Sequence, residues 1–230
     1  MTDFDHDAST SDPAATANDG TASETGSIYG EYADFLPRVM GMVVDRIEDF
    51  DRSVRERTGE GAYEHFNHRI KDEASMREKC DRKGLPQTPY SALHDIHDAI
   101  GCRIVCSFVD DVYALASHLE SQPEFTVLET KDYVRHPKPN GYRSYHMIIS
   151  VTTPFPDVTG TTPGHYPVEI QLRTIAMDSW AALEHQVKYK KDLGNANVEI
   201  VTQELKRCAD ELASCDLQMQ TIRNLINENK

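Results

Sequence analysis

The chain has 230 residues, 39% of them apolar, and carries 38 acidic against 24 basic side chains, for a formal net charge of −14. This apolar content can fill the core of one domain with a helical appendage. The negative balance argues against a general binder of DNA or other nucleic acid, because such proteins are basic overall, but it permits a local basic pocket.

Residues 1–26 are expected to form a disordered tail, because they hold six acidic residues, no Lys or Arg and almost no large apolar side chain. Such a segment cannot offset the entropy lost on ordering. The longest apolar runs, at 40–44 and 147–151, are too short to span a bilayer, and an acidic N-terminus is the reverse of a signal peptide. We therefore expect a cytoplasmic protein that does not bind a membrane.

The cysteines point to a reducing compartment. Their number is odd and they include no CxxC pair, as expected of buried thiols that form neither a disulfide nor a metal site. They are Cys80, Cys102, Cys106, Cys208 and Cys215.

The first predicted elements are a helix, a strand and a second helix. Apolar residues recur at steps of three and four over residues 36–57, which is typical of a helix. Residues 62–71 resemble a strand in composition, and Asp72 can cap a helix that Gly84 ends.

Four polar side chains surround this junction between strand and helix. Arg69 and Lys71 are two residues apart and share one side of the strand, while Ser75 and Lys79 follow at helical i+4 steps. They could line one concave surface near a helix N-terminus, which suits phosphate. The alternative is a charged helix face exposed to solvent.

Residues 85–97 are predicted to be a loop or a short helix, and the pairs His94-Asp95 and His97-Asp98 fall here. Two such pairs could indicate a metal hydrolase. Hydrolases of that type gather ligands from several separated helices, however, and no second set is evident in the sequence.

Residues 99–108 are apolar almost throughout and predict a central strand. Gly101 marks a place where backbone or ligand must come close. Arg103 needs a partner, because its charge lies within an otherwise apolar strand.

The segment 131–146, KDYVRHPKPNGYRSYH, combines cations with aromatic rings where Pro and Gly disfavour helix and sheet. Cations fixed beside exposed aromatic faces suit a ligand with phosphates and a flat base. The alternative is a solvated basic loop above packed tyrosines. The residues concerned are Lys131, Arg135, Lys138 and Arg143, with Tyr133, Tyr142 and Tyr145.

The following elements are predicted as a helix from residue 110 or 111, strands at 124–131, 145–152 and 166–174, and a helix at 175–191. In the last strand, three polar residues alternate with three apolar ones. A row of polar side chains indicates either an exposed sheet face or the floor of a site. The polar residues are Glu169, Gln171 and Arg173.

The last predicted helix, at about 196–228, has nine apolar positions at alternating steps of three and four, typical of a coiled-coil seam. We expect this seam to be buried against either the 36–57 helix or a neighbouring subunit. The positions are Val198, Val201, Leu205, Cys208, Leu212, Cys215, Met219, Ile222 and Ile226.

Four motifs, in this order, resemble those of the small alarmone synthetases, single-domain relatives of the RelA/SpoT GTP pyrophosphokinases. They are RIKDEASMREK (69–79), DAIGCR (98–103), the basic segment above, and EIQLRT with MDSWAALEHQVKYK (169–190). The resemblance covers roughly residues 31–191. The RelA/SpoT hydrolase and regulatory domains have no counterpart, which implies synthesis without hydrolysis.

The resemblance implies an α+β fold like that of the nucleotidyltransferases, a mixed sheet of about five strands flanked by helices, with helical extensions at both ends. It also implies Mg²⁺-dependent transfer of the β,γ-pyrophosphoryl group of ATP to the ribose 3′-hydroxyl of GDP or GTP, yielding ppGpp or pppGpp and AMP. Residues 27–191 are then the synthetase domain and residues 192–230 an oligomerisation helix.

On the ATP side, Arg69 and Arg103 resemble the pair whose guanidinium planes sandwich adenine. The residues that resemble the family's binding site for the ATP phosphates are Lys71, Ser75 and Lys79. Asp98 matches a Mg²⁺ ligand. Glu169 matches a second acid, which either completes the metal site or takes the proton from the 3′-hydroxyl.

On the acceptor side, Tyr142 resembles a tyrosine that stacks on guanine, and Lys138 and His146 resemble groups that hold the 5′-phosphates. Gln171 is similar in place to a further acceptor-side residue. Asp178 stands where some relatives have Asn, and its carboxylate could accept from both guanine N1–H and the 2-amino group.

Two alternatives stay open beside the synthetase. A different nucleotidyltransferase needs a Gly-Ser helix start and an Asp-x-Asp strand, and neither is found. A non-catalytic module on the same fold could bind nucleotide or single-stranded RNA, but it would be free to lose Asp98 and Glu169, which are both present. The family also assembles as tetramers, which implies a homo-oligomer here.

Overall fold

The computed structural model describes residues 26–189 and 195–228. Its strands form one mixed sheet in the order β1-β2-β5-β4-β3, with β2 and β5 parallel and the other neighbours antiparallel. This confirms the expected α+β class with a five-stranded mixed sheet. The strands are β1 (His65–Ile70), β2 (Ile100–Cys106), β3 (Phe125–Asp132), β4 (Tyr145–Thr153) and β5 (Gly164–Thr174).

The helices follow the predicted positions closely, and two short turns, Gly30–Phe35 and Ser91–Asp95, accompany them. The expected disordered tail, apart from Gly26, and the expected domain boundary at residue 191 lie outside the described residues. The helices are α1 (Leu36–Thr58), α2 (Glu73–Lys83), α3 (Val109–Glu120), α4 (Ile175–Tyr189) and α5 (Asn195–Glu228).

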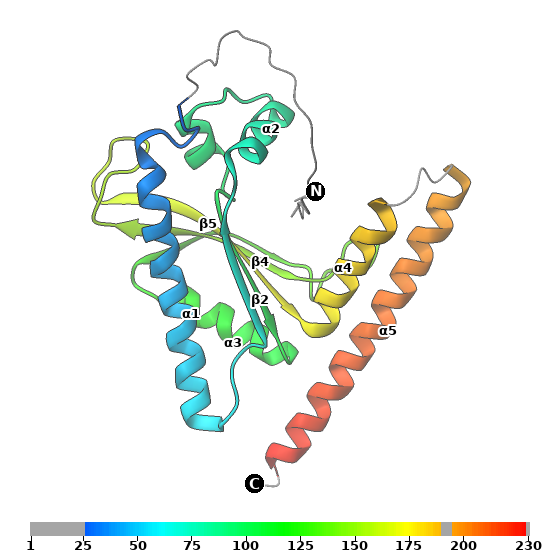
Figure 1. Cartoon of the computed structure of the whole chain (residues 1–230). Coiled ribbons are helices and arrows are strands. Elements are labelled where there is room, and N and C mark those ends of the chain that lie inside the picture. Colours follow the sequence, from blue (N-terminus) through cyan, green and yellow to red (C-terminus); the bar gives the residue numbers. More distant parts are fainter. Residues whose placement is uncertain (1–25, 190–194, 229–230) are drawn as a thin grey trace, which may run out of the picture.

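One face of the sheet is apolar, and α1 and α3 cover it (Figure 1). Alternate residues of the parallel pair point to this side, among them Cys102 and Ile104 of β2 and Ile170 of β5, all fully buried. Val39 and Val43 of α1 meet them in the same core. Burial of each such side chain contributes about 1.5–3 kcal/mol before entropy is counted, so this face fixes the sheet that carries the site.

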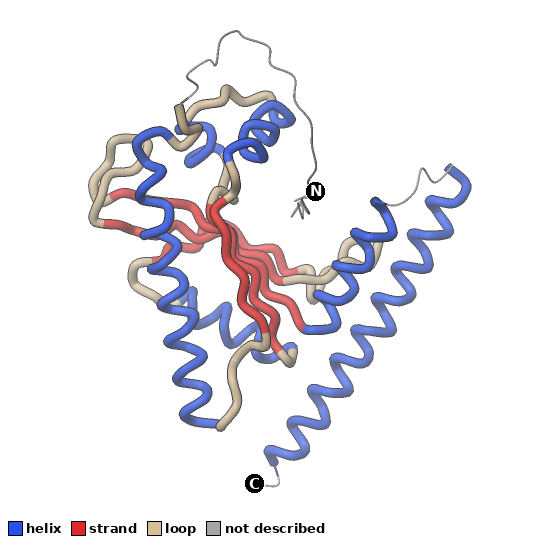
Figure 2. The backbone as a smooth tube through the Cα atoms, viewed as in Figure 1, coloured by secondary structure: helices blue, strands red, loops and turns tan. Residues whose placement is uncertain are grey.

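The opposite, polar face of the sheet lies between α2 and α4, each of which directly follows a strand of the sheet. Helix α2 follows β1 at the edge where β2 begins, and α4 follows β5 at the edge where β2 ends. Figure 2 shows these helices at opposite ends of the strands. The start of α2 is fixed as predicted, because Asp72 accepts a 2.9 Å hydrogen bond from the Ser75 amide.

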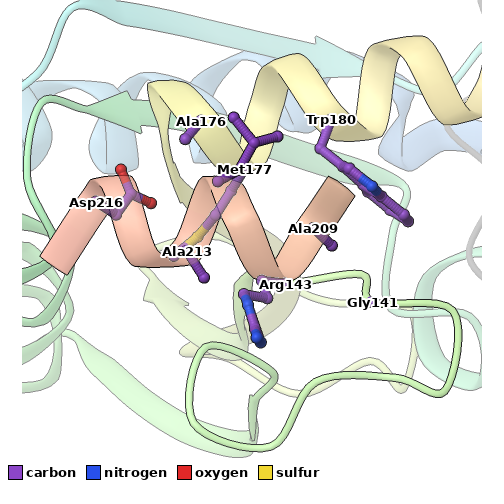
Figure 3. Close-up of a pocket in the computed structure, with 9 residues that line it drawn as sticks. Gly141, Arg143, Ala176, Met177, Trp180, Ala209, Ala213 and Asp216 are labelled. Atoms are coloured by element: carbon purple, nitrogen blue, oxygen red, sulfur yellow. The ribbon is translucent and has the colours of Figure 1, made fainter. Parts of the chain in front are cut away.

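Helix α5 packs on its own chain, but not by the predicted seam. The indole Nε1 of Trp180 donates to the Leu205 carbonyl at 2.9 Å, and the Thr174 hydroxyl donates to Asp216 at 2.6 Å. Ala209 and Gln220 are the buried residues of its inner face. Figure 3 shows Ala209, Ala213 and Asp216 beside α4 and the loop at Gly141 and Arg143.

The seam prediction is therefore wrong for the 36–57 helix, because α1 lies on the far side of the molecule from α5 (Figure 1). Most seam positions stay exposed, since small and polar residues supply the buried face instead. Val198, Met219, Ile222 and Ile226 are each about half exposed, at 47%, 49%, 49% and 54%. The neighbouring-subunit alternative stays a prediction.

The cysteine prediction holds in part. All five thiols are free, and Cys80, Cys102 and Cys106 are buried as expected, but Cys208 and Cys215 are exposed on α5. Both cysteines belong to the seam, and they are exposed because most of the seam is not covered within this chain. Among the described helices, none is long and apolar enough to cross a membrane.

Candidate active site

The polar face of the sheet brings the predicted residues into two rows that run across four or five strands. Register pairs Arg69 with Gly101, Gly101 with Glu169, and Glu169 with Ile148. The next row contains Arg103, Gln171, His146 and Lys131. Because Gly101 has no side chain, the space between Arg69 and Glu169 is free of one.

At the α2 end of this face, two lysines converge on one carboxylate. Lys79 forms a very short ion pair with Asp98, and Lys71 Nζ lies 3.4 Å from the same oxygen, Oδ2. Burial alone would raise the pKa of Asp98, but the two ammonium groups hold that pKa below its usual value. Asp98 is thus ionised at neutral pH and held in place before any ligand arrives.

The two arginines predicted to sandwich adenine lie on this same face, on adjacent strands. Arg103 is opposite Asn67, two residues along β1 from Arg69. Burial, and then the nearby Arg173, lower the pKa of Arg103. A flat, electron-rich ring stacked on guanidinium planes would suit this pair.

The basic loop, residues 133–144, folds over the β4–β5 side of the face. Lys138 Nζ lies 4.8 Å from the ring centre of Tyr133 and 4.9 Å from that of Tyr142. The Tyr142 hydroxyl lies 2.8 Å from His146 Nε2. The ring of Tyr142 is half-buried, so the loop presents cations and an aromatic ring together, as the sequence suggested.

The polar row of β5 is buried and is not an exposed sheet face. Glu169, Gln171 and Arg173 are at most 5% exposed. Gln171 Nε2 donates to Glu169 Oε2 at 3.2 Å, and His146 Nδ1 lies 3.9 Å from Glu169 Oε1. Burial lowers the pKa of His146, although Glu169 opposes that shift, so the imidazole tends to be neutral.

Arg173 joins this floor to the predicted base-recognition residues. Its guanidinium donates to Asp178 Oδ1 at 2.9 Å, to the Tyr142 hydroxyl at 2.9 Å and to Gln171 Oε1 at 3.3 Å. The sequence analysis placed Arg173 on the polar side of its strand but assigned it no role. Strand alternation shows which face a residue lies on, and it cannot show which distant loops meet it there.

A pocket opens beside these residues. Its wall joins the acceptor-side residues to the end of β3, and Glu129, which the sequence did not single out, bonds Lys131 at 2.9 Å. The lining residues are Glu129, Lys131, Tyr133, Lys138, His146, Met147, Ile148 and Glu169.

The predicted residues therefore form two groups. Lys71, Lys79 and Asp98 are in contact at one end, and Lys138, Tyr142, His146, Glu169, Gln171 and Asp178 are connected through Arg173 and the β5 floor at the other. Asp98 precedes β2, three residues before Gly101, which is the partner of Glu169. Ser75 lies one turn before Lys79.

A hard cation fits the Asp98 end. Oδ1 of Asp98 is buried and accepts no hydrogen bond from any residue that the structure describes. Within residues 26–189 and 195–228, no three or more His, Cys, Asp or Glu side chains form a metal cluster. One or two carboxylates completed by substrate phosphates is a usual way for proteins to bind Mg²⁺.

Comparison with known proteins agrees with this fold. Residues 68–194 match the family described as "Region found in RelA / SpoT proteins". The chain is 38% identical over 169 residues to GTP pyrophosphokinase YwaC of Bacillus subtilis, covering 74% of this chain and 78% of that protein. It is 38% identical over 165 residues to GTP pyrophosphokinase YjbM of the same organism, covering 72% and 74%.

Solved structures show the same similarity. Small alarmone synthetase 1 from Bacillus subtilis bound to its product pppGpp has a TM-score of 0.69 and 30% identity, over 86% of this chain and 98% of that chain. The same enzyme bound to AMPCPP has a TM-score of 0.64 and 28% identity, over 86% and 98%.

The fold and the polar sheet face thus define a small synthetase domain of the alarmone type. The chain belongs to the RelA/SpoT family, among its small GTP pyrophosphokinases.

Proposed function

We propose that this protein transfers the β,γ-pyrophosphoryl group of ATP to the ribose 3′-hydroxyl of GDP or GTP, forming ppGpp or pppGpp and AMP. The observation that carries the proposal is one continuous sheet face with an acid and two lysines at one end and an aromatic, cationic loop at the other. Glu169, a member of the second group, is paired with Gly101 of β2. A similar enzyme, small alarmone synthetase 1 from Bacillus subtilis, has been solved bound to AMPCPP and to its product pppGpp, which supports nucleotide substrates here.

ATP is assigned to the α2 end. Its adenine would stack between Arg69 and Arg103, and its phosphates would lie along Lys71, Ser75 and Lys79, near the N-terminus of α2. The space above Gly101 lets the triphosphate approach the sheet.

Mg²⁺ is assigned to Asp98, whose buried Oδ1 accepts no hydrogen bond from the residues that the structure describes. When bound, the ion neutralises phosphate charge and so makes the β-phosphorus easier to attack. The two lysines that pair with Asp98 in the free protein would then turn to phosphate oxygens. Each lysine would exchange a carboxylate for a phosphate, and Asp98 would exchange the ammonium groups for the cation, so no charge is left unpaired.

GDP or GTP is assigned to the loop end. Tyr142 would stack on guanine, Asp178 would accept from its N1–H and 2-amino group, and Lys138 and His146 would hold the 5′-phosphates. Gln171 lies beside Glu169 and would orient the ribose.

The chemistry needs one base and one in-line displacement. Glu169 takes the proton of the 3′-hydroxyl, whose oxygen attacks the β-phosphorus of ATP; the bond from that phosphorus to the α–β bridging oxygen breaks, and AMP leaves. We assign Glu169 as base and not as metal ligand, because its contacts are His146 and Gln171 on the acceptor side.

Two substitutions test these roles with labelled ATP and GDP. Asp98→Asn should lower kcat by at least about 10³-fold, since it removes the group assigned to the cation. Glu169→Gln should lower kcat by about 10²- to 10⁴-fold while leaving ATP binding unchanged. Asp95→Asn, three residues before Asp98 and exposed, is the matched control and should retain activity.

Equal activity in the Asp98→Asn and Asp95→Asn proteins would overturn the assignment of Asp98. Absence of labelled product from the wild-type protein, with nucleotide binding retained, would favour a non-catalytic binder on the same fold.

A further inference from the structure

Arg173 forms hydrogen bonds with three polar side chains of the acceptor group. It is 5% exposed at the end of β5. Nη1 donates to Asp178 Oδ1 at 2.9 Å, and Nη2 donates both to the Tyr142 hydroxyl at 2.9 Å and to Gln171 Oε1 at 3.3 Å. The guanidinium carbon lies 5.4 Å from the Tyr142 ring centre.

These three partners come from separate parts of the chain. Tyr142 belongs to the basic loop, Gln171 to β5 and Asp178 to the first turn of α4. A planar guanidinium has donors in a fixed fork, so bonds to three partners fix their mutual orientation as well as their distance. A lysine ammonium at the same place could not fix three such directions in one plane.

The charge of Arg173 is also locally balanced by Asp178. Both are members of one ion pair, and Arg103 on the adjacent strand adds a second cation nearby. An Asn at position 178 would leave this Arg without its carboxylate. Asp178 is 32% exposed through its side chain, so it can meet a ligand while Arg173 holds it from beneath.

We propose that Arg173 is the positioning residue for base selection: by fixing Tyr142 and Asp178 together, it makes the site prefer a purine that carries both an N1–H and a 2-amino group. This inference rests on the proposed function, because it concerns the acceptor of the same reaction. Arg173 itself touches neither the base nor the reacting atoms; it holds the ring that stacks and the acid that reads the base edge.

The test compares GDP with IDP, which lacks the 2-amino group, as acceptor for the full-length protein at saturating ATP. Arg173→Lys keeps the charge but loses the fork, and we expect about a 10- to 100-fold rise in KM for GDP. The KM for ATP should stay within about twofold. The preference for GDP over IDP should fall by about tenfold or more.

Two further proteins complete the design. Arg223→Lys is the matched control, because Arg223 forms an ion pair with Asp111 at 2.7 Å on α5, away from the site; its nucleotide preference should equal that of the wild type. Tyr142→Phe removes the hydroxyl that both Arg173 and His146 bind. If Tyr142 is held through Arg173, combining Tyr142→Phe with Arg173→Lys adds little to the loss from Arg173→Lys alone.

The outcomes are distinguishable. If the wild-type protein makes no product, the proposed function fails before Arg173 is tested. If the wild type is active, an unchanged GDP/IDP preference in Arg173→Lys, or equal KM increases for ATP and GDP, overturns the role of Arg173. If Arg173→Lys does not fold, Tyr142→Phe decides alone: a preference equal to that of the wild type overturns the proposal.

Discussion

At the residue scale, the site holds its charges in pairs before a ligand binds. Asp98 is paired with Lys71 and Lys79, and Arg173 is paired with Asp178. A buried charge without a partner lowers the folding stability. Such pairs therefore let a small domain keep phosphate-binding groups in its interior and stay folded.

Asp216 is the opposite case, a carboxylate whose neighbours do not fully compensate for its burial. Burial raises the pKa of Asp216, against the effects of Thr174 and Arg143. A raised folded-state pKa means that the folded protein binds the proton more tightly than the unfolded chain, so this stability is present at acid pH and is lost as the pH rises through the folded value. At neutral pH the ionised carboxylate therefore weakens the docking of α5.

We predict that Asp216→Asn raises the melting temperature at pH 7 and that the gain shrinks toward pH 4. Asp210, six residues earlier in α5, is the matched control, because hydrogen bonding to Lys206 lowers its pKa. Asp210→Asn should lower the melting temperature at pH 7, and that loss should also shrink on acidification. Two shifts of the same sign at pH 7 would contradict this account.

At the element scale, most of the fold followed from local patterns. Alternation placed the strands, and Asp72 and Gly84 were correct signals for the ends of α2. The inner face of α5 could not be predicted, because Ala209 and Gln220 are buried by the shape of α4 and the basic loop, whereas the apolar seam remains exposed. Apolar spacing shows that a helix has an apolar face, but it does not identify the surface that this face contacts.

For the site too, local sequence patterns did not show which distant segments come into contact. The motifs supplied Asp98, Glu169 and Tyr142, because their residue types and order were specific. Arg173 was missed, since its bonds to Tyr142 and Asp178 span 31 and 5 positions and depend on where the loop and α4 meet β5.

Gly141 connects the basic loop to α5 and gives a prediction at this scale. Its φ is +94°, and a Cβ there would come within 2.5 Å of Ala209 Cβ and 3.0 Å of Lys206 Cα. Gly141→Ala should therefore cost about 1–3 kcal/mol of folding stability and raise the KM for GDP, because loop and helix must move apart. Urea unfolding and steady-state kinetics measure both.

Gly160 provides the control for backbone strain alone. Its φ is +80°, yet nothing lies within 4 Å of the Cβ position. Gly160→Ala should lose about 1–2 kcal/mol through the left-handed conformation, with acceptor KM unchanged. Equal effects from the two substitutions would show that α5 does not support the acceptor loop.

At the scale of the whole molecule, the exposed side of α5 suggests self-association. The seam residues Val198, Met219, Ile222 and Ile226 are all about half exposed on this helix. We expect the 26.0 kDa chain to form an oligomer, a tetramer in particular, through this seam. Light scattering that shows a single species of monomer mass would contradict the expectation.

A paired substitution tests the seam itself. Met219→Glu with Ile222→Glu places charge on exposed positions, so it should dissociate the oligomer without unfolding the chain. Gln203→Glu, also exposed on α5, adds charge outside the seam and should leave the assembly intact.

The identity of the products tests the central proposal most directly. We predict that ³¹P NMR of the reaction with ATP, Mg²⁺ and GDP shows AMP and a 3′-diphosphate on the guanosine ribose appearing in equal amounts, with the 5′-diphosphate intact. Formation of ADP with a 3′-monophosphate, or of free pyrophosphate without a modified guanine nucleotide, would contradict it.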